Sequence, residues 1–195
     1  TIPKGYHPEE GDFLFQSLPE SDLAQAIEGA TDSPYSHVGV VIKNSQGQWW
    51  VREAIGPVKD TPLIDFITRG RGQVFDAYRL KEASKIDIPK MIHASEAYMG
   101  RPYDMQYAMD DDKIYCSELW YKAMQQATGL RLGKTVLLGS LNWQPYRETI
   151  EKYNQGPVPM QREMITPKDL AEAPQLELVY NTAFPSLKKA LFFLF

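Results

Sequence analysis

The stretch Tyr115-Cys116-Ser117-Glu118-Leu119-Trp120 contains the only cysteine in a chain of 195 residues. Apolar residues recur at helical spacing from Ser117 to Thr128, and Gly129 provides a favourable helix end. The pattern therefore predicts a helix that starts directly after Cys116. Free N–H groups at a helix N-terminus favour negative charge, so this position suits a thiolate nucleophile.

A second stretch, Tyr35–Ile42, places a histidine at the start of a β-branched strand. Turn-forming residues follow, and Trp49–Ile55 is predicted to return as the second strand of a hairpin. If the turn centres near Ser45, residues whose numbers add to about 90 lie opposite each other, and His37 faces Glu53. A slip of one residue would send Glu53 to the other face. In the predicted register, Glu53 orients His37, the base of a Cys–His–Glu triad.

Two groups near the cysteine are candidates for binding the oxyanion of an acyl-transfer reaction. They are the backbone N–H of Cys116 and the hydroxyl of Tyr103, which lies in a polar loop over residues 101–112. Glu118 suits the first turn of the helix, but its charge would oppose a thiolate that it faced. We expect Glu118 to point away from the sulfur or to bind a cationic group of a substrate.

Cys116 also has a purely structural interpretation, because a lone cysteine among apolar residues is often a small core residue. The other two histidines, His7 and His93, are expected to be surface or structural residues. Zinc accepts all three residue types found at His37, Glu53 and Cys116. No local pair such as H-x-x-x-H supports a zinc site, so we expect neither a metal nor another cofactor.

The composition is that of an ordinary globular protein, with 43% apolar and 24% charged residues. We expect one domain over residues 1–183. The net charge of −4 provides no basic surface for nucleic acid, and Arg69, Arg71 and Arg101 are not interleaved with aromatic residues. The single cysteine excludes an internal disulfide. No apolar run approaches the ~20 residues that a transmembrane helix requires.

The segment 184–195 ends in the six apolar residues Ala190–Phe195. Three interpretations stay open: a terminus that packs on the core or is unstructured, a cloning artefact, or an interfacial anchor assisted by Lys188 and Lys189. The last would give peripheral contact with the cell envelope.

The remaining pattern predicts an α+β fold with an antiparallel sheet. Ser21 and Thr166 are expected to cap two helices, and Pro167 suits a first helical turn. The segment bounded by Pro57 and Pro62 is expected to be a loop, and residues 130–145 to hold loops and turns. Strands are expected over residues 11–16, 37–42, 49–55, 73–80 and 176–180, and helices over 22–30, 63–67, 88–98, 117–128, 146–153 and after Thr166.

Four segments carry a resemblance to a known family: Gly11–Phe15, Ser36–Val41, Gly100–Asp104 and Tyr115–Trp120. With the final stretch up to about residue 181, the chain resembles the circularly permuted papain-like amidases, the YiiX-type branch of the NlpC superfamily of cysteine peptidases. The resemblance implies an antiparallel sheet that carries the histidine, packed against a helix that carries the cysteine, with the histidine first in the chain.

The same resemblance implies that Cys116 is the nucleophile, His37 the base and Glu53 the third residue. It also implies that the cleft is flanked by the loop Gly29–Ser36 and by the segment around Tyr103, so Ser36 is expected to contribute to binding of the substrate or the oxyanion. Relatives often carry export signals, which favours a periplasmic or cell-envelope location.

The expected activity is hydrolysis of an amide or peptide bond, or transfer of an acyl group. Substrates in this superfamily divide between peptidoglycan-type peptides and lipid or acyl groups. We expect a cell-wall peptide, with Asp104 and Glu118 as acceptors for an amino group. An apolar tunnel would instead favour a lipid acyltransferase or thioesterase with the same triad. A third interpretation is a ligand-binding module whose Cys116 is unreactive.

Overall fold

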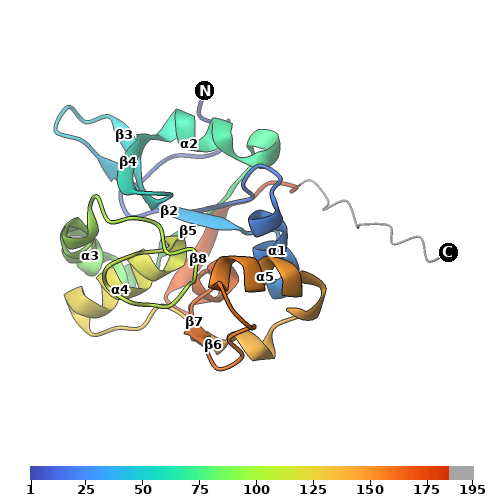
Figure 1. The fold of residues 1–195 in the computed structure, drawn as a ribbon. Helices are drawn as coiled ribbons and strands as arrows, with labels where there is room; N and C mark the ends of the chain where they lie inside the picture. Colours follow the sequence, from blue (N-terminus) through green and yellow to red (C-terminus); the bar gives the residue numbers. More distant parts are fainter. Residues whose placement is uncertain (185–195) are drawn as a thin grey trace.

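The β-branched and small residues of His37–Lys43 form β2, a strand of a six-stranded sheet. Six of its seven residues are buried, which explains the nearly continuous apolar sequence. The computed structural model describes residues 1–184, and Figure 1 shows helices above and below the sheet. The strand order is β4-β3-β2-β1-β5-β8, and all neighbours pair antiparallel.

The other strands of the sheet are β1 (Phe13–Gln16), β3 (Trp49–Ala54), β4 (Val58–Pro62), β5 (Asp76–Leu80) and β8 (Leu176–Tyr180). A two-stranded ribbon is formed by β6 (Val136–Leu137) and β7 (Glu163–Met164). The α-helices are α1 (Asp22–Thr31), α2 (Leu63–Arg69), α3 (Ile88–Ser95), α4 (Cys116–Thr128), α5 (Arg147–Asn154) and α6 (Pro167–Ala171). Short 3₁₀ helices cover Arg71–Gln73, Glu82–Asp87, Glu96–Tyr98, Leu138–Ser140 and Gln144–Tyr146.

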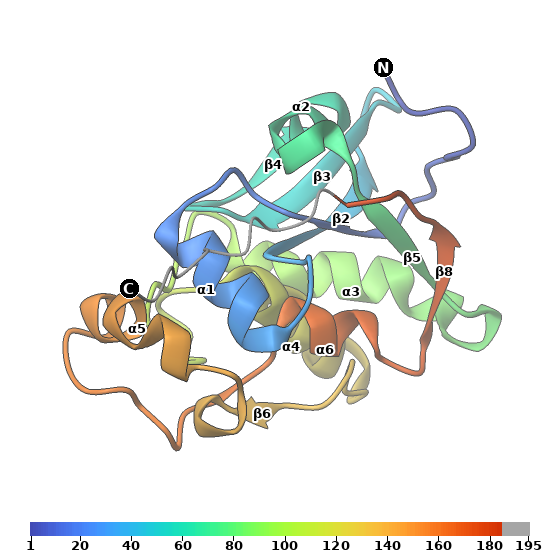
Figure 2. The ribbon, with the colours of Figure 1, turned by 90° about the vertical axis from the view of Figure 1, so that its right-hand side faces the viewer.

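Helix α4 packs on one face of the sheet and α2 on the other, as Figures 1 and 2 show from two directions. Trp120 of α4 is fully buried and meets Phe13 of β1 edge-on, with ring centroids 6.3 Å apart. On the opposite face, Phe66 of α2 packs with Leu14 and Val51 in a second core. A sheet packed against the cysteine-bearing helix confirms the predicted α+β architecture.

Local hydrogen bonds fix both ends of α4. The Glu118 Oε1 atom accepts the backbone N–H of Tyr115 at 3.1 Å and so caps the N-terminus. Gly129 closes the helix with a φ of 76°, a left-handed conformation that glycine adopts without strain. The helix begins at Cys116, one residue before the predicted start.

The predicted caps of two other helices are confirmed. The Ser21 hydroxyl accepts the N–H of Ala24 at the start of α1, and the Thr166 hydroxyl accepts the N–H of Asp169 at the start of α6. Each bond satisfies a backbone donor that has no partner within its own helix.

Two parts of the predicted element map are wrong. Val58–Pro62, expected to be a loop, forms the edge strand β4 along β3. An edge strand tolerates proline because one of its sides makes no ladder hydrogen bonds. The segment 130–145, expected to hold only loops and turns, contributes β6 to the small ribbon with β7.

The predicted hairpin register is wrong by two residues. Val41 pairs with Val51, so paired positions add to 92 rather than to the expected 90. Asn44 explains the difference, because its side chain accepts the N–H groups of Gln46 and Gln48 and centres the turn on residue 46. Side chains alternate with a period of two, so this shift leaves His37 and Glu53 on the same face.

No helix among residues 1–184 is long and apolar enough to cross a membrane. The predicted apolar tail falls outside the described residues from position 185 onward. Its first residue, Phe184, meets the ring of Tyr35 with a centroid separation of 5.5 Å.

Gly39 of β2 allows a close approach between the sheet and α2, which generates a stability prediction. A Cβ atom here would collide with the Val51 side chain and lie 3.1 Å from Phe66 Cε2. We expect Gly39→Ala to lower the free energy of unfolding by about 1–3 kcal/mol, because an overpacked core has to shift. Urea denaturation measures the effect. In the double variant Gly39→Ala/Val51→Ala, the added methyl group has room, so the loss of unfolding free energy should be smaller than the sum of the losses in the two single variants. Additive losses would contradict the proposed collision.

Candidate active site

Cys116 is the first residue of α4, and only 1% of its surface is exposed. Its neighbours on each side hold the helix start in place. The Tyr115 hydroxyl accepts the N–H of Ile165 at 2.9 Å, and the Ser117 hydroxyl donates to the Ile165 carbonyl at 2.7 Å. The backbone N–H of Cys116 is therefore presented at a rigid helix N-terminus, where backbone donors have no intrahelical partner.

His37 lies at the first position of β2 and reaches both the cysteine and Glu53. Its Nε2 atom is 2.6 Å from Glu53 Oε2, and both side chains are buried. Cys116 Sγ lies 4.0 Å from the carbonyl oxygen of Ser36, the residue before His37, and Cys116 is close enough to raise the pKa of the imidazole. Because Nε2 is bound to Glu53, Nδ1 is the nitrogen available to the thiol. The structure thus brings Cys116, His37 and Glu53 into one connected chain.

Glu53 is surrounded by donors from three elements. Its Oε1 accepts the Thr61 hydroxyl of β4 at 2.7 Å and Arg69 Nη1 of α2 at 2.9 Å. Its Oε2 accepts Arg69 Nη2 at 2.6 Å in addition to His37. Sequence inspection alone missed Arg69 and Thr61, because neither lies in a recognisable motif.

The charges of this chain support one another. Burial raises the pKa of Glu53, but the hydrogen bonds and charges of His37 and Arg69 outweigh it and lower this pKa from 4.5 to about 2. Burial lowers the pKa of His37, but the contacts with Cys116 and Glu53 outweigh it and raise this pKa above its ordinary 6.5. The site therefore favours a protonated imidazole beside an ionised carboxylate.

Two tyrosines stand beside the sulfur. The Tyr103 hydroxyl interacts with Cys116 and lies 2.9 Å from the Tyr107 hydroxyl. Burial, reinforced by negative charge at Cys116, raises the pKa of both hydroxyls, so they stay protonated donors. The oxyanion role of Tyr103 stays a prediction. Tyr107 was missed, although its spacing of four from Tyr103 in a polar loop is a signal that could have indicated it.

Ser36 contributes backbone rather than side chain to the site. Its carbonyl oxygen is 4.0 Å from Cys116 Sγ, whereas its hydroxyl accepts the N–H of Leu18 at 2.8 Å. Asp104 stabilises the loop over residues 101–112 that carries Tyr103 and Tyr107, called the tyrosine loop below. Its carboxylate accepts the N–H groups of Gln106 at 2.9 Å and Ala108 at 2.6 Å.

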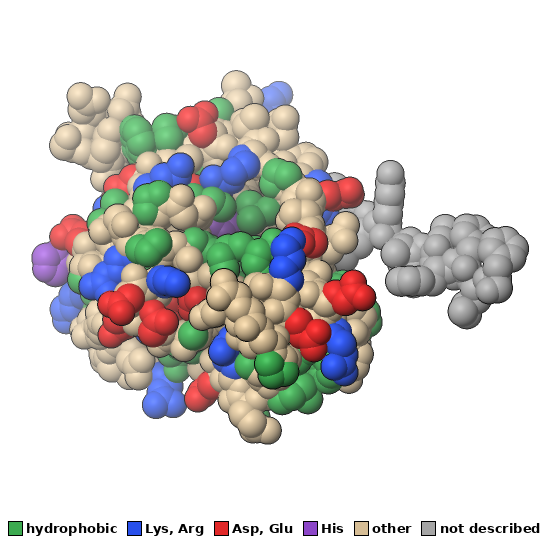
Figure 3. All heavy atoms as spheres, in the orientation of Figure 1, with side chains coloured by type: hydrophobic (Ala, Val, Ile, Leu, Met, Phe, Trp, Pro, Cys, Tyr) green, Lys and Arg blue, Asp and Glu red, His purple; other side chains and the backbone are tan. Residues whose placement is uncertain are grey.

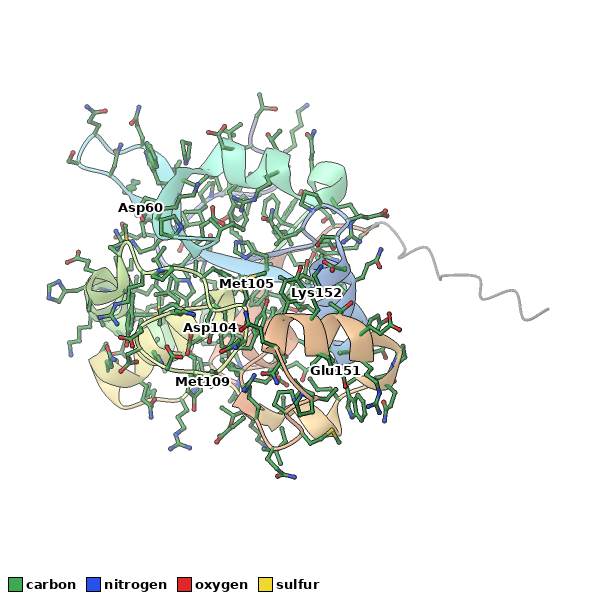
Figure 4. The ribbon with its side chains drawn as sticks, in the orientation of Figure 1. Asp60, Asp104, Met105, Met109, Glu151 and Lys152 are labelled. Carbon is green, nitrogen blue, oxygen red and sulfur yellow. The ribbon has the colours of Figure 1, made fainter. Side chains whose placement is uncertain are left out.

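Glu118, the last of the predicted substrate-binding residues, is fully buried and lies 3.1 Å from Lys122 Nζ. Burial raises the pKa of Glu118 to about 7, although Lys122 opposes this shift. Neither Glu118 nor Asp104 lines the cavity beside Cys116. Figure 4 shows Asp104 on the loop between α3 and α4.

An apolar cavity opens beside Cys116. Its volume is about 90 Å³. One wall is formed by α1, another by α5 and a third by the segment that carries Trp143. Figure 3 shows hydrophobic side chains around a hollow on this face, and Figure 4 shows Met105 close to α5. The apolar lining residues include Leu23, Ala26, Ile27, Met105, Leu138, Leu141, Trp143 and Ile150.

The lowered pKa of Glu53 predicts how stability depends on pH. A carboxyl group with a folded-state pKa of about 2 stabilises the fold above its ordinary value of 4.5 and loses this contribution as pH falls toward 2. Wild type should therefore exceed Glu53→Gln in free energy of unfolding by roughly 3 kcal/mol at neutral pH. The gap should narrow below about pH 4.5.

Urea denaturation between pH 7 and pH 3 measures this gap. The exposed Glu177→Gln on β8 serves as a matched control and should track wild type. If the difference in free energy of unfolding between wild type and Glu53→Gln stays constant with pH, the partners of Glu53 do not lower its pKa in the folded state.

Comparison with known proteins identifies the family of this chain. Residues 7–180 match the family described as permuted papain-like amidase enzyme, YaeF/YiiX, C92 family. The chain is also similar to the protein named Uncharacterized protein YiiX of Escherichia coli strain K12. The two are 33% identical over 179 residues, which cover 89% of this chain and 87% of the relative.

A solved structure described as that of metalloprotein yiiX from Escherichia coli O157:H7 has the same fold. Its TM-score is 0.84 at 31% identity, and the match covers 91% of this chain and 99% of that one. The histidine strand precedes the cysteine helix in the sequence, as a permuted papain-like order requires. The chain therefore belongs to the family of permuted papain-like amidases and has the permuted papain-like fold.

Proposed function

We propose that the protein is a cysteine amidase that works through Cys116, His37 and Glu53. The orientation of His37 supports this proposal most strongly. Its Nε2 is held by Glu53 at 2.6 Å, which leaves its other nitrogen available to the thiol at the start of α4. A nucleophile, a base and a group that orients the base are the parts that covalent acyl transfer requires.

The proposed reaction proceeds through a thioester. His37 Nδ1 first takes the thiol proton, and the resulting Cys116 thiolate attacks the substrate carbonyl carbon. The Cys116 N–H and the Tyr103 hydroxyl bind the oxyanion. The imidazolium then gives its proton to the amide nitrogen, which leaves as an amine. Water attacks the thioester, His37 takes a proton from that water, and the same proton returns to sulfur as the acid leaves.

A metal ion does not fit these residues. The related YiiX structure is described as that of a metalloprotein. Among residues 1–184 of this chain, no three His, Cys, Asp or Glu side chains are grouped to share a metal ion. Both oxygens of Glu53 are occupied by donors from His37, Thr61 and Arg69. The proposed reaction accordingly contains no step through a metal.

The apolar cavity favours a second candidate for the substrate. A cell-wall peptide with a free amino group needs an acidic partner, and Asp104 and Glu118 are engaged elsewhere. None of the residues that line the cavity is acidic. We therefore also propose that the same triad acts on an apolar acyl group, as an amidase, thioesterase or acyltransferase whose acyl chain occupies the cavity.

The triad proposal predicts loss of activity on single substitutions. Cys116→Ala and His37→Ala should each lower kcat/KM for fluorogenic acyl-aminocoumarin amides by at least about 10³-fold, because the nucleophile or its base is gone. The exposed His93→Ala should keep wild-type activity. Intact-protein mass spectrometry should detect an acyl adduct on Cys116. Hydrolysis that survives in Cys116→Ala would overturn the proposal.

The cavity proposal predicts a dependence on acyl chain length. For a series of acyl-aminocoumarins from acetyl to dodecanoyl, kcat/KM should rise roughly 3- to 4-fold per methylene until the cavity is filled, since each buried CH₂ contributes about 0.8 kcal/mol. Ile27→Trp should shorten the preferred chain. Leu178→Trp, on the exposed face of β8, is the matched control. A flat series, with faster cleavage of peptidoglycan fragments, would favour the peptide substrate instead.

A further inference from the structure

Arg69 binds the Glu53 carboxylate and has no role in the proposed reaction steps. It is the last residue of α2, and its side chain is 27% exposed. Phe66, one helical turn earlier, is fully buried and lies 5.8 Å from the His37 ring between centroids. The burial of α2 against the sheet therefore carries Arg69 to the carboxylate.

The contact between Arg69 and Glu53 is a two-point contact. Nη1 donates to Oε1 at 2.9 Å, and Nη2 donates to Oε2 at 2.6 Å. Nη2 also donates to Gln16 Oε1 at 3.1 Å, and Gln16 Nε2 is anchored to the Phe66 carbonyl at 2.9 Å. The planar guanidinium fits a carboxylate in this way, whereas the point charge of a lysine does not.

The position of Arg69 has an electrostatic consequence for His37. Glu53 stabilises the imidazolium, and a second cation on the same carboxylate weakens that effect. The imidazolium can then release its proton more readily to a leaving amine. The two-point contact also prevents rotation of Glu53, which would take Oε2 away from His37.

We propose that Arg69 is a positioning residue of the triad, which fixes the Glu53 carboxylate against His37 and partly neutralises its charge. This inference rests on the proposed function. Its alternative is a purely structural ion pair that ties α2 to the sheet. Several charged or titratable groups lie around His37. They are Glu53 of β3, Arg69 of α2, Cys116 of α4, Tyr103 and Tyr107 of the loop over residues 101–112, and the Glu28–Arg71 pair next to Ser36.

The neighbouring residue in β3 offers a matched control. Arg52 makes the same kind of two-point contact with Asp60, at 2.8 Å and 3.0 Å, and its side chain is 10% exposed. This pair ties β3 to β4 without touching the triad. Arg52→Met therefore reproduces the loss of a largely buried arginine–carboxylate pair, together with the hydrogen bonds of Arg52 to Ser95 and Ile92 of α3, away from the triad.

The experiment compares pH profiles of kcat/KM and of Cys116 alkylation by iodoacetamide. Arg69→Met should lower kcat/KM by roughly 10- to 100-fold, because the carboxylate loses its orientation. It should also move the alkaline limb of both profiles upward by about 1 pH unit. Without Arg69, the full negative charge of Glu53 stabilises the His37 imidazolium and raises the pKa of His37. Arg52→Met should leave both limbs in place, whatever it does to stability.

Arg69→Lys separates the orientation of the Glu53 carboxylate from the neutralisation of its charge. It also replaces Arg69→Met as the test variant if Arg69→Met does not fold. It keeps the charge but loses the second bond, so kcat/KM should fall while the alkaline limb stays near the wild-type pH. Profiles of folded Arg69→Met, or of Arg69→Lys, with the rate and the limb both unchanged would overturn the inference. Wild-type activity that does not depend on Cys116 would instead overturn the proposed function, so the two failures are distinguishable.

Discussion

Glu53 is a carboxylate with no exposed surface, and its ionised state places demands on every element around it. Removing such a group from water costs several kcal/mol unless charged and polar partners replace the solvent. Those partners come from β2, β4 and α2, in the form of His37, Thr61 and Arg69. The edge strand β4 and the short helix α2 therefore each supply a donor that keeps the Glu53 carboxylate ionised.

The site joins the two cores of the molecule. Cys116 belongs to the core between α4 and the sheet, whereas Phe66 and Val51 belong to the core under α2. A residue in the middle of a strand projects to one face only. His37 is the first residue of β2, so its side chain lies at the end of the strand and reaches the thiol of one core and the carboxylate of the other. The placement of the histidine at a strand start is thus a structural requirement of the site.

The parts of this structure that could be predicted from the sequence are those governed by short-range periodicity. The spacing after Cys116 predicts α4, and a period of two along the hairpin predicts that His37 and Glu53 share a face. That second prediction survived an error in register, because the error was an even number of residues. The strand β4 was missed because Pro57 and Pro62 resemble loop signals, and only the pairing with β3 makes them part of an edge.

Arg69 and the cavity could not be predicted for a different reason. Arg69 lies 16 residues from Glu53 and carries no local signal, so only the docking of α2 brings the two together. The cavity combines side chains from α1, the tyrosine loop, the Trp143 segment and α5, which are distant in the sequence. Arrangements of this kind depend on tertiary packing, which periodicity does not encode.

The charge of the cavity lining supports the acyl substrate that we propose. Arg162 is the one Lys, Arg, Asp or Glu residue among the lining residues of the described chain, and it is a cation. Its Nη1 donates to the Gln106 carbonyl and to Asn154 Oδ1, which holds the side chain between the tyrosine loop and α5. An ammonium group in an apolar space needs a negative partner to offset its lost hydration. Here it would meet a positive charge and apolar side chains, whereas a neutral acyl chain would lose no hydration and would bury apolar surface. The lining thus supports the proposed substrate with an uncharged acyl part over a cationic peptide end.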